Sequence, residues 1–148
     1  MATIKSYTDI NQSKFLAEIL PLKSADMYYA GHQSIINPKD WEYGDTPNIR
    51  GKYISFDDKR IFYPCWSLAT LLNVLPNEII TDNMFECHYQ IDIRKYGGGN
   101  NTTLYQIAYG NNRGLSGSWH DMINTEEKES LIDCCVQMII KLHELKML

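Results

Sequence analysis

The C-terminal stretch, residues 124–148, restricts the fold more than any other part of the chain. Its apolar residues recur at spacings of four, three, four and three, the period of a helix with one buried face: Leu131, Cys135, Met138, Leu142 and Leu145. Asn124, with Glu127 three residues later, predicts a capping box at the start of this helix. A stripe of this size needs a broad apolar surface, so we expect the other elements to close over it. A homodimer seam along the same helix is the alternative use of the stripe.

Length and composition are those of an ordinary globular protein. With 148 residues, the chain is predicted to form a single domain over residues 1–148. Hydrophobic residues make up 44% and charged residues 22%, which argues against large-scale disorder. The net charge of −4 lacks the basic excess that nucleic-acid binding favours. The chain shows no N-terminal apolar leader and no run of about 18 apolar residues, so we expect a cytoplasmic protein that does not enter a membrane.

The cysteines and histidines show no metal-binding spacing. The sequence contains no Cys-x-x-Cys pair and no His-x-His or His-x-x-x-His pair. We therefore expect reduced thiols, mostly buried, and neither a metal site nor a cofactor. The residues concerned are Cys65, Cys87, Cys134 and Cys135, and His32, His88, His120 and His143.

Two further helices are predicted in the first half of the chain. Asn11–Leu20 carries a short apolar stripe that a proline ends, and Asp9 or Asn11 is its expected cap. Trp66–Leu75 repeats the pattern, with Ser67 as the expected cap and a proline directly after the last leucine. Both are short, so each needs tertiary contacts to persist.

The segments between these helices are predicted to be loops and a hairpin. Residues 21–52 are punctuated by glycine and proline, so we predict irregular structure there, with a helical turn over residues 24–29. Residues 53–56 and 60–63 flank an Asp-Asp-Lys sequence, which is typical of a hairpin turn.

The clearest strand is predicted over residues 85–94, where apolar and polar residues alternate strictly. Residues 102–109 are expected to pair with it across the glycine-rich turn at 97–99, and residues 115–119 to add a short edge strand. Such alternation indicates one buried and one solvated face. We therefore predict an α+β fold in which an antiparallel sheet of about four or five strands carries two main helices on one face.

No motif predicts a catalytic residue. The run Gly97–Gly99 lies between two predicted strands, whereas a phosphate-binding loop needs a strand followed by a helix. The run 114–118 lacks the Gly-x-Ser-x-Gly spacing of a nucleophile elbow. His120 and Asp121 are adjacent, but nothing in the sequence brings a third group to them.

Aromatic residues in the glycine- and proline-rich segment are the strongest candidates for binding. Either their rings fill gaps over the sheet, or they form a loop-borne surface for a protein partner. A small-ligand or enzyme pocket between residues 21–51 and the sheet is the alternative, and the polar strand face around His88 is another place for a partner. The candidate residues are Tyr28, Tyr29, His32, Trp41 and Tyr43.

Three stretches carry a resemblance to a known family: residues 25–29 (ADMYY), residues 64–76 (PCWSLATLLNVLP) and residues 131–145. In these stretches, and in their order, the chain resembles a family of small uncharacterised proteins encoded by prophages and mobile elements of gut anaerobes. The resemblance implies a cytoplasmic accessory protein that binds a host or phage protein rather than one that catalyses a reaction. It implies no site residue.

Overall fold

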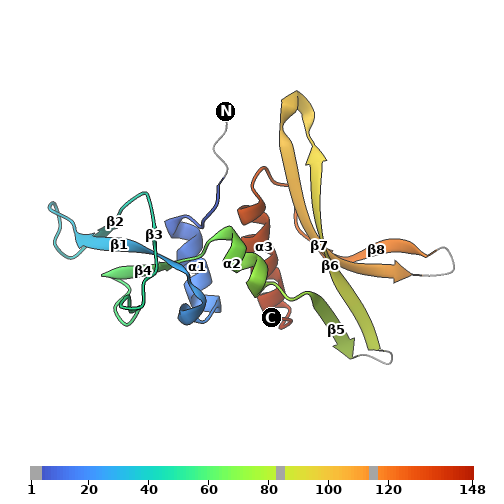
Figure 1. Cartoon of the computed structure of the whole chain (residues 1–148), viewed down its shortest axis with the longest axis horizontal. Helices are drawn as coiled ribbons and strands as arrows, with labels where there is room; N and C mark the ends of the chain where they lie inside the picture. Colours follow the sequence, from blue (N-terminus) through green and yellow to red (C-terminus); the bar gives the residue numbers. More distant parts are fainter. Residues whose placement is uncertain (1–4, 83–85, 114–116) are drawn as a thin grey trace. The chain divides into compact units, whose positions relative to one another are not determined.

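The structure, a computed structural model, describes residues 5–82, 86–113 and 117–148. These residues form three α-helices and two antiparallel sheets of four strands each, which confirms the predicted α+β class (Figure 1). The chain divides into two compact units, Lys5–Val74 and Leu75–Leu148. The strands are thus shared between two sheets, and the single domain expected over residues 1–148 stays a prediction.

The sheet of the Lys5–Val74 unit is built around β1 (Met27–Gln33). Strands β3 (Asn48–Ile49) and β4 (Phe62–Cys65) both pair with Met27 and the residue after it, so they flank β1 on opposite sides. Strand β2 (Trp41–Tyr43) pairs with the last three residues of β1 and forms a ribbon with it.

Two helices complete this unit, and both begin where the sequence predicts. Helix α1 (Ile10–Ile19) starts with a capping box between Asp9 and Gln12. Helix α2 (Leu68–Val74) starts after Ser67, whose Oγ accepts from the amide of Thr70 at 3.2 Å. The core of the unit is apolar: Leu16, Leu20, Ala25, Tyr29, Phe56, Cys65, Trp66 and Leu71 are all buried.

Three local predictions are wrong in this unit. Residues 21–52, which were predicted to be irregular, contain β1, β2 and β3. Residues 53–56 form no strand, so the predicted hairpin over 53–63 is absent; β4 instead pairs with β1. Residues 24–29 are not a helical turn, because the short 3₁₀ helix η1 (Leu22–Ser24) ends at the first of them and β1 begins at Met27. The tyrosine-rich strand β1 finds an apolar partner in β4, and this long-range pairing outweighs the local turn signals.

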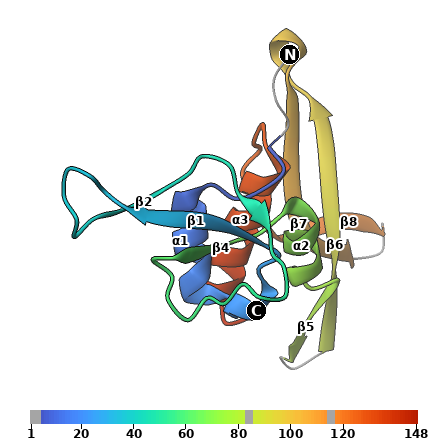
Figure 2. The same ribbon diagram turned by 60° about the vertical axis from the view of Figure 1, so that its left-hand side comes forward.

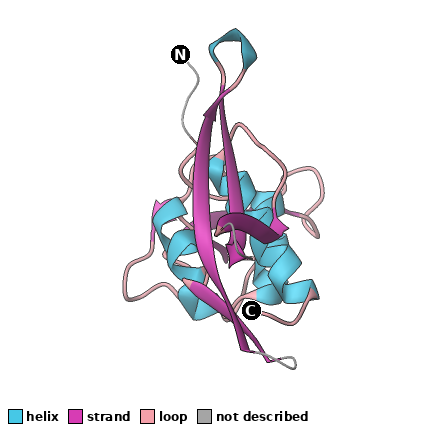
Figure 3. Ribbon diagram, turned by 90° about the vertical axis from the view of Figure 1, so that its right-hand side faces the viewer, coloured by secondary structure: helices cyan, strands magenta, loops and turns pink. Residues whose placement is uncertain are grey.

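The Leu75–Leu148 unit is an antiparallel meander of β5 (Glu78–Asp82), β6 (Glu86–Gly97), β7 (Thr103–Arg113) and β8 (Ser118–Asn124). The predicted pairing of residues 85–94 with residues 102–109 is therefore confirmed. Residue 85 of this pair, and residues 115 and 116 of the predicted edge strand, lie outside the described residues. The β6–β7 hairpin closes through the 3₁₀ helix η2 (Gly99–Asn101) (Figure 3). Strand β5 was not predicted.

Helix α3 (Leu131–Glu144) packs against β7, and its stripe is buried from Cys135 to Leu142 but leaves Leu145 half exposed. The predicted start is wrong, because Ser130 and not Asn124 caps the helix. Asn124 ends β8, and the following backbone stays beside β7 through bonds such as the 2.7 Å bond from the Tyr105 amide to the Lys128 carbonyl. These backbone hydrogen bonds to β7 hold residues that would have to be helical if α3 began at Asn124.

Candidate functional site

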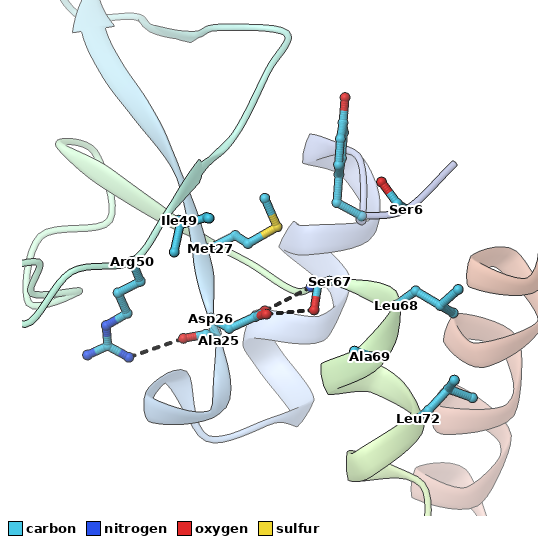
Figure 4. Close-up of a pocket in the computed structure, with 11 residues that line it drawn as sticks. Ser6, Ala25, Asp26, Met27, Ile49, Arg50, Ser67, Leu68, Ala69 and Leu72 are labelled. Atoms are coloured by element: carbon cyan, nitrogen blue, oxygen red, sulfur yellow. Dashed lines mark hydrogen bonds between the residues drawn. The ribbon is translucent and has the colours of Figure 1, made fainter. Parts of the chain in front are cut away.

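A hollow of about 930 Å³ lies within the Lys5–Val74 unit, open on one side rather than enclosed (Figure 4). Four separate segments line it: residues 6–7, residues 25–27 at the start of β1, residues 49–50 at β3, and one face of α2. Its lining is mainly apolar, with contributions from Met27, Ile49, Leu68, Ala69 and Leu72.

Two charged groups line the hollow, and both are already bonded within the unit. The carboxylate of Asp26 accepts from the Ser67 amide at 2.8 Å and from its hydroxyl at 2.6 Å (Figure 4). Burial works to raise the pKa of Asp26, but these bonds outweigh it and hold that pKa below its usual value. The guanidinium of Arg50 lies 4.5 Å from the Phe56 ring centre and donates to the Ala25 carbonyl at 3.2 Å. Both groups therefore serve the fold.

The turn between β1 and β2 presents two isoleucines to solvent. Ile35 is 99% and Ile36 is 95% exposed. The turn is nevertheless held by a set of bonds: the Ser34 hydroxyl accepts from the amides of Ile36 and Asn37, and the Ser34 amide donates to the Asp40 carbonyl at 2.9 Å. The ribbon carries this turn beyond the other strands and helices of its unit (Figure 2). We call residues 34–40 the apolar tip.

The first two residues predicted to bind a partner lie at the base of the ribbon. Tyr29 is buried, and its hydroxyl donates to the Thr8 carbonyl at 2.7 Å. Tyr28 is half-buried and forms a T-shaped contact with the Phe62 ring, with ring centres 5.3 Å apart. Tyr29 thus fills the core, as the gap-filling interpretation of these rings expects.

The other three predicted residues lie nearer the tip, on the ribbon of β1 and β2: Trp41 and Tyr43 are on one face, and His32, which pairs with Glu42, is on the other. Tyr43 donates to the Lys59 carbonyl at 3.0 Å, and the Trp41 ring lies 5.7 Å below the Arg60 guanidinium. His32 faces Glu42 at 3.4 Å and is exposed. None of the five predicted residues is among the described residues that line the hollow.

Sequence reasoning missed Ile35, Ile36 and Ile49. A signal for the first two was present, since two isoleucines directly precede an Asn-Pro pair in a polar turn, where apolar side chains have no core to enter. Ile49 carried no such signal, because its place beside α2 depends on the pairing of β3 with β1.

In the Leu75–Leu148 unit, the polar face of the sheet is cross-linked by ion pairs and hydrogen bonds. Arg94 on β6 donates to Asp92 at 2.7 Å, to Gln106 at 3.1 Å and to both oxygens of Asp121 on β8. Asp121 also accepts from the Trp119 indole at 2.7 Å. Bonding to Arg94 is the main reason that the pKa of Asp121 lies far below its usual value. The donors and acceptors of this cluster face each other.

His88 lies on the same sheet, between two carboxylates. Its Nδ1 is 2.6 Å from Glu78 and its Nε2 is 3.1 Å from Glu86. The bond to Glu78 is the main cause that raises the pKa of His88, although the imidazole is exposed. Among the described residues, no group of three or more His, Cys, Asp or Glu side chains has a geometry that could hold a metal ion.

Comparison with known proteins adds no relative: no family model matches the chain, and neither a curated protein nor a solved structure is similar to it. Within the described part of the chain, no helix is both long enough and apolar enough to cross a membrane. The four cysteines are free thiols, and burial raises the pKa of Cys135 to about 12.

Proposed function

We propose that this chain is a non-enzymatic, cytoplasmic accessory protein of a phage or mobile element and that it binds a host or phage protein. The observation that carries the proposal is the apolar tip, where Ile35 and Ile36 are almost fully exposed on a well-bonded turn. Trp41 and His32, on the same ribbon, are proposed to flank the contact.

The physical support is the cost of leaving these side chains in water. Burying one isoleucine stabilises a complex by roughly 1.5–3 kcal/mol, and the turn that holds Ile35 and Ile36 is already ordered, so binding loses little conformational entropy. Apolar anchors on an ordered element, surrounded by polar neighbours, are the usual centre of a protein–protein contact. Within the tip, Lys39 and Asp40 are polar neighbours of Ile35 and Ile36.

The hydrogen bonding of the charged groups in the hollow favours a non-enzymatic function. A general acid or base needs an atom that can give or take a proton and that faces the substrate. The Asp26 oxygens instead accept from Ser67, with one bond to each oxygen, and Arg50 is bonded to backbone carbonyls. What the hollow offers a ligand is mainly apolar surface.

A photo-reactive amino acid at position 36 tests the proposal in the cells that produce the protein. We expect irradiation to join position 36 to a protein, and the adduct to disappear when Ile35 is also replaced by serine. Tyr53 is 86% exposed in the same unit and provides the matched control position. Absence of any protein adduct at position 36, or equal adducts at positions 36 and 53, contradicts the proposal.

A small-ligand site in the hollow is the second candidate function, because about 930 Å³ lies within the usual range for such sites. This candidate predicts that a hydrophobic fluorescent probe binds the isolated protein and that Ala69→Glu, which places a charge in the hollow, abolishes its binding. Asn73→Glu is the control, since Asn73 is exposed on the same helix but does not line the hollow. Equal probe binding by both variants excludes this candidate.

A further inference from the structure

We propose that the apolar tip of one copy of this chain occupies the hollow of a second copy, so that two copies form a reciprocal dimer. This inference rests on the proposed function, because it names the protein that the tip binds. It joins two apolar features of the Lys5–Val74 unit: the protruding Ile35 and Ile36, and the hollow beside Ile49 and α2.

The two features fit in size and chemistry. The hollow, at about 930 Å³, is several times larger than the apolar cavities of about 150 Å³ that take up a benzene molecule, so it has room for two branched side chains. Its apolar lining includes Met27, Leu68 and Leu72, and Ile49 is 83% exposed there. Convex aliphatic groups against a concave aliphatic surface remove apolar area from water on both partners.

Several polar groups at both surfaces are already bonded within their own copy. In the tip, the Ser34 hydroxyl and the Asp40 carbonyl already accept from backbone amides. In the hollow, Asp26 is bonded to Ser67 and Arg50 to backbone carbonyls. Burial of these particular groups therefore does not leave them unpaired, which limits the main cost of placing apolar side chains beside charges.

The tip of a copy does not reach the hollow of that same copy. Met27 at the hollow and Gln33 at the end of β1 are separated by six steps of extended strand, roughly 20 Å at about 3.3 Å per residue, and the tip lies beyond Gln33. The contact must therefore be made between two copies. A two-fold arrangement makes it twice and leaves no tip or hollow unfilled, whereas a head-to-tail chain leaves one of each at its ends.

The test is a complementation experiment by analytical ultracentrifugation. The tip variant carries Ile35→Ser and Ile36→Ser, and the hollow variant carries Ala69→Glu; all three positions are exposed, so the fold is expected to tolerate the changes. We expect a concentration-dependent dimer for the unchanged protein. Each variant alone should show a dimer dissociation constant raised roughly 30-fold or more, because the loss affects both contacts.

An equimolar mixture of the two variants distinguishes dimerisation through the tip and the hollow from any other mode of dimerisation. The tip variant keeps its hollow and the hollow variant keeps its tip, so the mixture should form a heterodimer through one intact contact, tighter than either homodimer. Tyr53→Ser and Asn73→Glu are the controls, since they change exposed residues outside both surfaces, and they should dimerise like the unchanged protein.

Three outcomes overturn the inference: an unchanged protein that stays monomeric at all concentrations, variants that associate like the unchanged protein, or a mixture no tighter than the separate variants. A monomeric protein that still forms a position-36 adduct with a different protein overturns the self-contact but supports the proposed function. A monomer whose tip binds phosphatidylcholine vesicles, with no protein adduct at position 36, overturns both.

Discussion

The two units of this protein treat their exposed side chains in opposite ways. In Leu75–Leu148, the polar sheet face pairs its charges internally, as Arg94 does with Asp92 and Asp121. In Lys5–Val74, charges serve the helix caps and loops while large apolar groups face water. Among the described residues, the large hydrophobic side chains that are more than four-fifths exposed all belong to the Lys5–Val74 unit: Ile35, Ile36, Ile49 and Tyr53.

This contrast indicates where binding is to be sought. Ion pairs that satisfy each other stabilise a surface but offer few free donors or acceptors to a partner. Single exposed apolar residues are common on proteins, but Ile35 and Ile36 are adjacent and lie on an ordered turn. The polar network of the Leu75–Leu148 unit is thus the better candidate for stability, and the apolar tip the better candidate for binding.

Replacing one tryptophan in each unit should give the largest contrast in stability. Trp66 is fully buried and its indole donates to Ser24 at 3.0 Å, so Trp66→Ala should lower the free energy of unfolding by about 3–5 kcal/mol. Trp119 is 37% exposed and its indole donates to Asp121, so Trp119→Ala should cost about 1–2 kcal/mol. Urea denaturation measures both, and equal losses would contradict the assignment of Trp66 to a core.

Two glycines should be nearly irreplaceable, one in each unit. A Cβ at Gly31 would collide with the Arg60 carbonyl oxygen, and one at Gly110 with the His120 carbonyl oxygen. We expect Gly31→Ala and Gly110→Ala each to destabilise by about 1–3 kcal/mol, because backbone has to move. Gly44→Ala is the control, since nothing lies within 4 Å of its added Cβ, and should change stability by less than about 0.5 kcal/mol. Thermal denaturation ranks the three, and a tolerated Gly110→Ala would place β8 further from β7 than described.

Local patterns predicted the helices and the long hairpin, since these depend on neighbours in sequence. The cap at Ser67 and the alternation that leads to the buried Tyr89 needed no knowledge of distant residues. The start of α3 failed because Asn124 satisfies a capping motif but is held in β8 by its pairing with Ala108. A local motif states what a segment can do, and sheet pairing decides whether it does so.

The candidate site was only partly predictable for the same reason. Residues 25–27 and 49–50 of the segment 21–51 line the hollow, but they face α2 rather than a separate sheet. The position of α2 beside these residues depends on the bond between Asp26 and Ser67, 41 residues apart. Tyr29 was a reasonable binding candidate as an aromatic residue in a turn-rich segment, but it lies on a buried strand face, which its own neighbours did not indicate.

The ion-pair network should make the Leu75–Leu148 unit sensitive to acid. The Asp121 pKa is lowered in the folded state, mainly by Arg94, so this carboxylate contributes stability above the unfolded pKa of about 4 and loses it as pH falls through the folded value. Asp121→Asn should therefore cost about 1–2 kcal/mol at pH 7, and the two unfolding curves should converge toward pH 2. Asp45→Asn, at an exposed loop position, is the control of equal charge change. A difference that persists unchanged in acid would assign the loss to packing instead.

The smallest effect is expected at His88, where the sign is opposite. Its folded pKa is raised, first by the bond to Glu78, so the contribution to β5–β6 pairing is fully present below the unfolded pKa of about 6.5 and is lost as pH rises through the folded value. A proton NMR titration should place His88 above that unfolded pKa. Glu78→Gln should lower its pKa more than Glu86→Gln does, since Glu78 lies at 2.6 Å and Glu86 at 3.1 Å. If the two substitutions act equally, the imidazole senses only the general negative potential of the hairpin, and the specific bond across β5 and β6 does not form in solution.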